Sequence, residues 1–209
     1  MADKKVTRSA KEDVVNDVEV GILLRHCRDL LDQIVIRIPL YTGMRIGEVQ
    51  HMRNTWVNFD KGYIQIPSRQ ACGCFECRRF RGRIWEPKSK AGIRNLLIVP
   101  EVGDILRQAF QTKPYIAKSR QLLEIRFAKI KGRAGITEKR YPHCLRATFA
   151  TRMAEQGMSA PSLTYIMGWE SLEPAEAYVQ SSMKRAHLEQ KEILGLNNPD
   201  LHIDTNAKL

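Results

Sequence analysis

The sequence predicts a mainly α-helical domain with a small antiparallel β-sheet, an α+β fold. Two observations predict this class. Apolar residues recur at helical spacing near the start of the chain and again after residue 100, whereas the intervening segment alternates and is rich in proline and glycine. A chain of 209 residues, of which 43% are hydrophobic, can bury one core.

Three helices are expected at the start of the chain. Helical spacing covers residues 12–30 and 31–41, and a third helix starts near Arg45. Gly43 suits the turn between the second and third helices, because glycine accepts backbone angles that other residues avoid.

The hydrophobic period then changes to that of strands. Residues 62–67, 83–88 and 93–100 each have a strand-like pattern, and each segment contains a proline that suits a strand end or an edge. Ala91-Gly92 supplies a turn, so we expect the last two strands to form a β-hairpin.

The remainder of the chain is predicted to be helical. Helices are expected over 101–112, 118–131, 143–156, 160–167 and 173–192. Three regions follow from this pattern: a flexible N-terminal arm over 1–11, a single domain over 12–195, and a polar C-terminal tail over 196–209.

Charge points to a polyanionic partner, with nucleic acid as the first candidate. The chain carries a net charge of +11 and has a pI near 9.6. Residues 69–94 contain eight basic and two acidic side chains, so this stretch alone contributes a net charge of +6. The residues expected to contact DNA are Arg78, Arg79, Arg81, Arg83, Lys90 and Arg94.

Targeting signals are not apparent. The chain has no apolar run of 18 residues and no signal-peptide pattern at its start. We therefore expect a cytoplasmic, DNA-associated protein that does not enter a membrane.

Three of the five cysteines are clustered. An odd number of cysteines in a protein expected in the cytoplasm argues against a disulfide framework. Cys72, Cys74 and Cys77 form a C-x-C-x-x-C insertion near residues 69–83 that suggests a zinc-bound knuckle. The fourth ligand could be Cys27, Cys144, His51 or a group on a partner; the alternative is three reduced thiols in a basic loop.

Three further clusters suit chemistry on a phosphodiester. They are Thr42-Gly43-Met44-Arg45-Ile46-Gly47-Glu48, Pro142-His143-Cys144-Leu145-Arg146, and Met167-Gly168-Trp169 with Tyr178 nine residues after Trp169. The guanidinium fork matches two phosphate oxygens, so Arg45 and Arg146 are expected to clamp a phosphate. The phenol of Tyr178 would attack it, with help because its ordinary pKa is ~10.

The order of these clusters resembles the catalytic domain of the tyrosine recombinase (integrase) family, in particular its phage- and archaeal-integrase-like members. The resemblance covers about residues 12–185. It implies the tyrosine recombinase catalytic-domain fold and site-specific DNA recombination. Tyr178 would form a 3′-phosphotyrosyl link and release a 5′-hydroxyl, with no cofactor for catalysis.

The resemblance also implies roles for single residues. His143, on the same helix face as Arg146, could take the tyrosine proton or donate to a phosphate oxygen. A hairpin lysine protonates the departing 5′-oxygen in the family; Lys88 fits best, and Lys90 is a credible substitute. Trp169 stands where the family more often has histidine, and indole can only donate a hydrogen bond and pack.

Glu48, Tyr165 and Tyr141 lie in or near the same clusters. Glu48 is expected to hold Arg45 through an i, i+3 contact. Tyr165 lies in an apolar helical segment and is expected in the core. Tyr141 precedes the histidine cluster and lacks the family spacing for a nucleophile.

We expect the protein to bind double-stranded DNA. We also expect it to be a monomer in free solution and a tetramer on DNA. Met183, Ala186 and Ile193, at helical spacing, could link protomers; the alternative is a helix packed on its own core. The alternatives are type IB topoisomerase-like relaxation and a non-catalytic DNA-binding accessory role.

The start of the chain leaves no room for the family's usual N-terminal DNA-clamping domain, so we expect the chain to be either a fragment or a protein with half the clamp.

Overall fold

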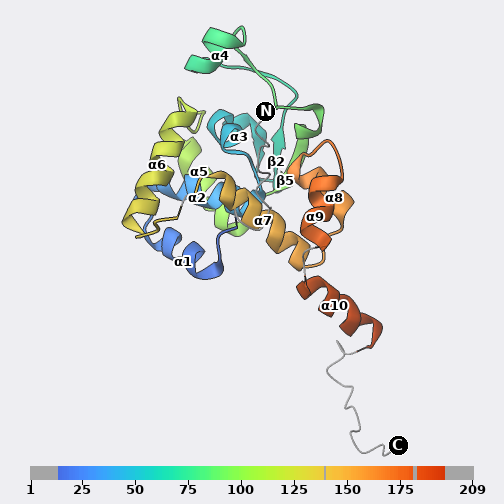
Figure 1. Cartoon of the computed structure of the whole chain (residues 1–209). Helices are drawn as coiled ribbons and strands as arrows, with labels where there is room; N and C mark the ends of the chain where they lie inside the picture. Colours follow the sequence, from blue (N-terminus) through green and yellow to red (C-terminus); the bar gives the residue numbers. More distant parts are fainter. Residues whose placement is uncertain (1–13, 139, 181–182, 196–209) are drawn as a thin grey trace, which may run out of the picture.

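The computed structural model describes residues 14–138, 140–180 and 183–195 (Figure 1). The N-terminal arm expected over residues 1–11 and the polar tail expected over 196–209 lie outside the described residues. The described chain is a helical body with small antiparallel sheets, which confirms the predicted fold class. No helix in the described ranges is long and apolar enough to cross a membrane.

The first three helices lie close to where the sequence predicts them. They are α1 (Asp17–Arg25), α2 (Leu30–Thr42) and α3 (Ile46–His51). Helix α1 begins later than expected because Asn16 and Glu19 form a capping box, which satisfies its first amide groups. Gly43 ends α2 with a φ of 67°, and a Cβ at this position would lie 2.6 Å from the Phe149 ring. Glycine is therefore required at this turn.

The main sheet has three antiparallel strands in the order β1-β2-β5. They are β1 (Val57–Asn58), β2 (Tyr63–Ile66) and β5 (Arg94–Leu97), and β1 follows a 3₁₀ turn over Asn54–Trp56. A separate two-stranded ribbon pairs β3 (Gln70–Ala71) with β4 (Ile84–Trp85).

The predicted hairpin between residues 83–88 and 93–100 is wrong. Strand β5 pairs with β2, whereas β4 pairs with β3, and Ala91-Gly92 belongs to a 3₁₀ turn over Lys90–Gly92. The register explains the difference, because pairing Leu96 with Ile64 puts two apolar side chains on the buried face of the sheet. This long-range burial outweighs a local turn preference.

The second half of the chain is helical, as predicted. The helices are α5 (Pro100–Thr112), α6 (Arg120–Arg133), α7 (His143–Glu155), α8 (Ala160–Met167), α9 (Glu173–Gln180) and α10 (Met183–Ile193). The single helix predicted over 173–192 is therefore represented by α9 and α10, on either side of residues 181–182, which lie outside the described residues.

Two apolar clusters form the interior. The larger one surrounds α2, whose residues Val35, Ile36 and Ile38 are fully buried and which packs against α5, α6 and α7. The smaller one joins α7, α8 and α9. Helix α7 contributes to both clusters, so it fixes the C-terminal helices relative to the rest of the body.

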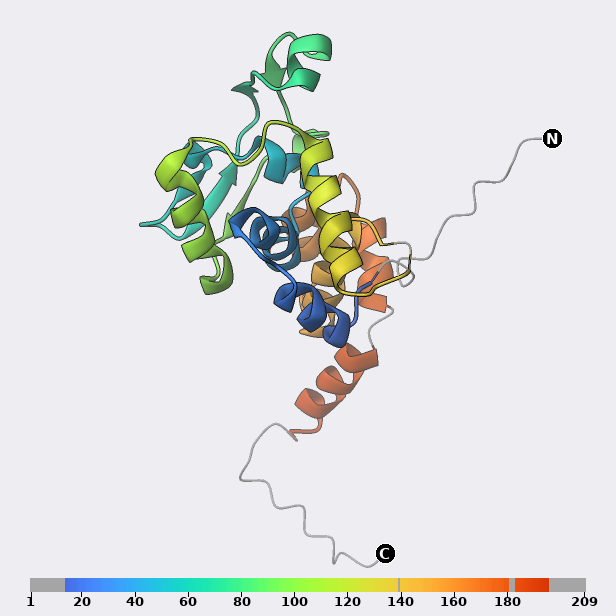
Figure 2. The same ribbon diagram turned by 90° about the vertical axis from the view of Figure 1, so that its left-hand side faces the viewer.

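Two elements stand away from this body. Helix α4 (Phe75–Phe80) protrudes at one end with the β3–β4 ribbon, and α10 extends at the opposite end (Figures 1 and 2). The sequence predicts a cysteine knuckle near α4, but it does not predict a helix there.

Candidate active site

Glu48 organises one side of the site. It is 3% exposed and accepts a hydrogen bond of 2.9 Å from the Arg45 side chain, which confirms the predicted i, i+3 contact. Burial alone would raise the pKa of Glu48, but Arg94 and Arg45 lower it below its ordinary value. Glu48 is therefore an anion that orients the Arg45 guanidinium.

Arg94 is the second partner of Glu48, and its predicted role as a DNA contact is wrong. Its side chain is buried and donates to both Glu48 carboxylate oxygens, at 3.1 and 2.9 Å. Its Nε donates to the carbonyl of Ile166 at 2.6 Å, so the side chain joins β5 to α3 and α8. Period-2 alternation places Arg94 on the same face as buried Leu96, which is why it points inward.

Arg146 lies at the junction of the two apolar clusters. It is 2% exposed and donates to the carbonyls of Gly43 and Met167. Burial, followed by the nearby positive charge of Arg45, lowers the pKa of Arg146 to about 9, so the guanidinium stays charged at neutral pH. Because a buried charge is costly unless it is paired, this cation favours the binding of an anion.

The two arginines meet at the end of α8. Arg45 Nη2 donates to the carbonyl of Gly168 at 2.9 Å, next to the Met167 carbonyl that Arg146 contacts. Gly168 has a φ of 60°, and a Cβ there would lie 2.8 Å from Arg94 Nη1. The glycine between α8 and Trp169 thus allows three arginines to approach one turn.

Trp169 and Tyr178 connect to Arg146. Their rings stack with centroids 5.7 Å apart and an interplanar angle of 10°, and the Arg146 guanidinium lies 5.8 Å from the Trp169 ring centroid. Tyr178 lies three residues after buried Ala175 in α9, so helical spacing turns its half-buried ring toward the body.

A cleft of about 970 Å³ brings the other predicted catalytic residues together. Its lining includes Arg45, Lys88, His143 and Arg146. His143 is the first residue of α7, so it is exposed at the helix N-terminus while Arg146, one turn later, is buried. Lys88 is exposed in the loop between β4 and β5, and not at the end of a hairpin strand as predicted.

Tyr165 and Tyr141, the two alternatives to Tyr178 as nucleophile, are both exposed. Tyr165 is 56% exposed, so the prediction that it lies in the core is wrong. Helix α8 buries Leu163 and Met167, and Tyr165 lies on the opposite side of the helix from both. Tyr141 is 58% exposed and lines the cleft beside His143.

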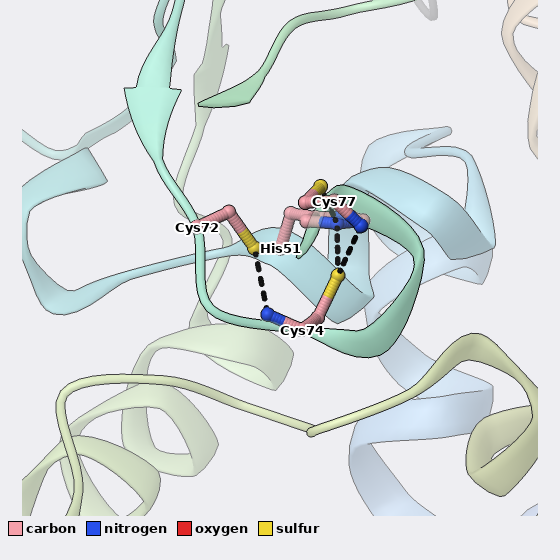
Figure 3. Close-up of side chains that lie close together, drawn as sticks. All are labelled: His51, Cys72, Cys74 and Cys77. Carbon is pink, nitrogen blue, oxygen red and sulfur yellow. Dashed lines mark hydrogen bonds between the residues drawn. The ribbon is translucent and has the colours of Figure 1, made fainter. Parts of the chain in front are cut away.

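The cysteine cluster gains a fourth member in the structure. His51 joins Cys72, Cys74 and Cys77, and their potential ligand atoms all lie within 4.8 Å of one another (Figure 3). Of the three fourth ligands considered from the sequence, His51 is the one that the fold brings to the thiols. Cys27 instead donates to the Leu23 carbonyl, and burial raises the pKa of Cys27 to about 11.

The remaining predicted DNA contacts lie on the surface. Exposed side chains are those of Arg78, Arg79, Arg81, Arg83 and Lys90. The first three lie in α4 or directly after it, so they belong to the element that protrudes from the body.

Comparison with known proteins agrees with the fold. The model of the phage integrase family matches residues 103–185, which contain His143, Arg146, Trp169 and Tyr178. The tyrosine recombinase XerA of Pyrococcus furiosus is 26% identical over 174 residues, 76% of this chain and 52% of that protein. XerC of Lactobacillus leichmannii is 22% identical, over 83% of this chain and 60% of its own length.

Solved structures share the fold at low sequence identity. The Tn1549 transposon integrase in complex with a circular intermediate DNA has a TM-score of 0.68 at 18% identity, covering 92% of this chain and 68% of the integrase. The catalytic domain of bacteriophage HP1 integrase has a TM-score of 0.59 at 18% identity, covering 90% of this chain and 98% of that domain. The chain spans about half the length of the recombinase relatives that it matches in sequence. The family match over residues 103–185, the relatives and the fold together support a tyrosine recombinase catalytic domain in this chain.

Proposed function

We propose that this chain is a site-specific DNA recombinase or integrase that cleaves and rejoins DNA through a 3′-phosphotyrosyl intermediate at Tyr178. The observation that carries the proposal is Arg146. Its buried guanidinium links the cleft containing Arg45, Lys88 and His143 to the Trp169–Tyr178 stack. Two structural neighbours, the Tn1549 integrase and the XerH recombinase, are complexes with DNA, which supports duplex DNA as the partner.

The proposed reaction is a reversible transesterification. The phenolic oxygen of Tyr178 bonds to phosphorus, and the bond from phosphorus to the 5′-oxygen breaks. Arg45 and Arg146 hold the non-bridging oxygens, where negative charge grows in the transition state. The N-terminus of α7, at His143, adds a partial positive charge at the same cleft.

Two proton transfers complete the step. His143 accepts the phenol proton, either directly or through a water molecule, and Lys88 donates a proton to the departing 5′-oxygen. Religation reverses both transfers with a different 5′-hydroxyl. Because phosphodiester bond energy is kept in the phosphotyrosine, no cofactor is needed for this chemistry.

Any zinc held by Cys72, Cys74 and Cys77 is structural in this proposal. Three thiolates and one imidazole complete a tetrahedral shell and leave no open position for a substrate. Catalysis by folded protein should therefore not depend on added metal.

The general acid can be identified with a modified substrate. Lys88→Ala should cleave ordinary DNA poorly but recover on DNA with a bridging 5′-phosphorothiolate, since a thiolate leaves without a proton. A denaturing gel of covalent adducts on both substrates measures the recovery. Lys90→Ala is the matched control, because Lys90 is also exposed and lies two residues away. Recovery by Lys90→Ala alone would assign the role to Lys90.

Assembly to a tetramer on DNA is part of the proposal. Strand exchange between two duplexes requires four cleavages, so four copies of Tyr178 must meet. Helix α10 stands away from the body, and Ile193 and Leu194 near its end are 85% and 59% exposed, which suits docking on a neighbouring protomer.

Removing this helix should separate binding from exchange. A chain ending at Ser182 should bind a single site as the full chain does but fail to bring two duplexes together. Gel-shift and recombination assays on paired sites measure the two steps. Normal recombination by the shortened chain would rule out α10 as the link between protomers.

A further inference from the structure

We propose that His51, Cys72, Cys74 and Cys77 bind one zinc ion, and that this ion holds residues 70–85 as a DNA-contacting arm beside the catalytic cleft. The inference rests on the proposed function only in taking DNA as the partner. The cysteine cluster would thus bind a metal, and residues 70–85, which protrude from the body, would contact DNA.

The spacing of the ligand atoms suits a tetrahedral ion. Zinc–sulfur bonds of about 2.3 Å and zinc–nitrogen bonds of about 2.0 Å place tetrahedral S and N ligands about 3.5 Å apart. His51 Nε2 lies 3.5 Å from Cys74 Sγ and 3.5 Å from Cys77 Sγ. Cys72 Sγ lies within 4.8 Å of the other three atoms, so a small inward shift completes the shell.

His51 is oriented to offer Nε2. Its Nδ1 lies 2.7 Å from the Gly47 carbonyl, a contact that requires the proton on Nδ1 and leaves the Nε2 lone pair facing the thiols. The ring stacks on Trp85 with centroids 5.3 Å apart. The His51 carbonyl accepts from Gln70 Nε2 at 2.7 Å, so the arm is already attached to the histidine at both of its strands.

Backbone amides support charge on the sulfur atoms. The Cys74 N–H donates to Cys72 Sγ at 3.5 Å, and the Cys77 N–H donates to Cys74 Sγ at 3.4 Å (Figure 3). Such bonds stabilise thiolates, which are the form that binds zinc. Cys74 is the N-cap of α4 and Cys77 lies within it, so the ion would fix this helix directly.

The arm lacks a core of its own. It consists of two strands of two residues and a six-residue helix, and both phenylalanines of α4 are mostly exposed, Phe75 by 61% and Phe80 by 69%. The buried side chains of the arm are Cys72, Cys77 and Trp85. A unit of this size needs a cross-link to hold one conformation, and a metal with four ligands supplies it.

The fixed arm presents positive charge next to the active site. Residues 70–85 contain four arginines and one glutamate, so they carry +3 before any metal binds. Arg81 and Trp85 line the same cleft as Arg45 and Lys88, which makes the base of the arm a wall of that cleft. Arg78 and Arg79 lie farther out on exposed α4, where they can contact phosphates beyond the cleavage point.

The first measurement is metal content. Protein purified under reducing, chelator-free conditions should contain about one zinc per chain, as measured by mass spectrometry of the metal. Cys72→Ser and Cys77→Ser should lose the zinc, and Cys27→Ser, a thiol outside the cluster, should keep it. No zinc in the wild type, or full zinc in both ligand variants, would overturn the proposal.

The second measurement is DNA affinity against salt. An Arg78→Gln, Arg79→Gln double variant keeps all four ligands and should keep its zinc. It should bind a labelled 30-base-pair duplex more weakly, with a salt slope lower by about 2, since each lost phosphate contact lowers the slope by about 0.9. Zinc-free Cys72→Ser should show a loss in the same direction, while Cys27→Ser binds as the wild type does.

Equal affinity and slope in the double variant would refute the role of the arm even if zinc is present. Failure of the proposed function is seen in a different assay. Tyr178→Phe should retain zinc and arm-dependent binding, and wild-type protein that binds zinc and DNA but forms no covalent adduct would contradict the recombinase proposal alone.

Discussion

Tyr178→Phe should abolish the covalent protein–DNA adduct while preserving DNA binding. The substitution removes the attacking oxygen but keeps the ring that stacks on Trp169 at 5.7 Å, so the local packing should persist. A duplex nicked a few bases beyond the cleavage point traps the adduct, because the short fragment that carries the released 5′-hydroxyl diffuses away before religation. A denaturing gel then measures the adduct, and anisotropy measures binding.

Two other tyrosines provide matched controls. Tyr141 lines the cleft and Tyr165 lies on the exposed side of α8, and both are more than half exposed. Tyr141→Phe and Tyr165→Phe should both form the adduct. An undiminished adduct in Tyr178→Phe, or its loss in Tyr141→Phe alone, would show that the nucleophile has been misassigned.

Arg146→Ala should slow cleavage by roughly 10²–10³-fold or more, because removing one charged donor from a preorganised transition-state site costs several kcal/mol. The same change should lower stability, since the carbonyls of Gly43 and Met167 lose a buried donor. Each carbonyl left unsatisfied costs about 1–3 kcal/mol. Arg146→Lys keeps the charge but loses the fork, so rescue should be partial.

Arg45→Ala separates the two effects. The Arg45 side chain is 25% exposed and donates to Glu48, which retains Arg94 as a partner when Arg45 is removed. We therefore expect a comparable loss of cleavage with a smaller drop in melting temperature than for Arg146→Ala. Cleavage within a few-fold of wild type in either alanine variant would contradict the phosphate clamp.

Local patterns were sufficient to predict most of the helices, although not α4. Helix α2 and helices α5 to α8 follow from apolar spacing, and in the structure Asp29, Ser119 and Ser159 cap α2, α6 and α8. The sheet needed information from farther along the chain. The turn at Ala91-Gly92 favours a hairpin locally, but burial of Ile64 against Leu96 selects a different partner strand.

The sequence identified the residues proposed to contact the phosphate, but not the buried residues that hold them in place. The i, i+3 relation of Arg45 and Glu48 is visible in the sequence, whereas Arg94 reaches the same carboxylate from 46 residues away. Its charge suggested a DNA contact, and the strand alternation that places it beside buried Leu96 was the available signal for an interior position. His51 could be no more than one of several candidate ligands before the fold brought it to the thiols.

The contacts of Arg146 have an evolutionary consequence. The side chain proposed to hold the substrate also ties α2 to α8 through two backbone carbonyls. Selection for a folded protein and selection for a working one therefore act on the same position. Lys88, on an exposed loop, is subject only to the second. Once selection for activity is relaxed, inactivating changes at Lys88 should accumulate before changes at Arg146, and the inactive descendants should remain folded.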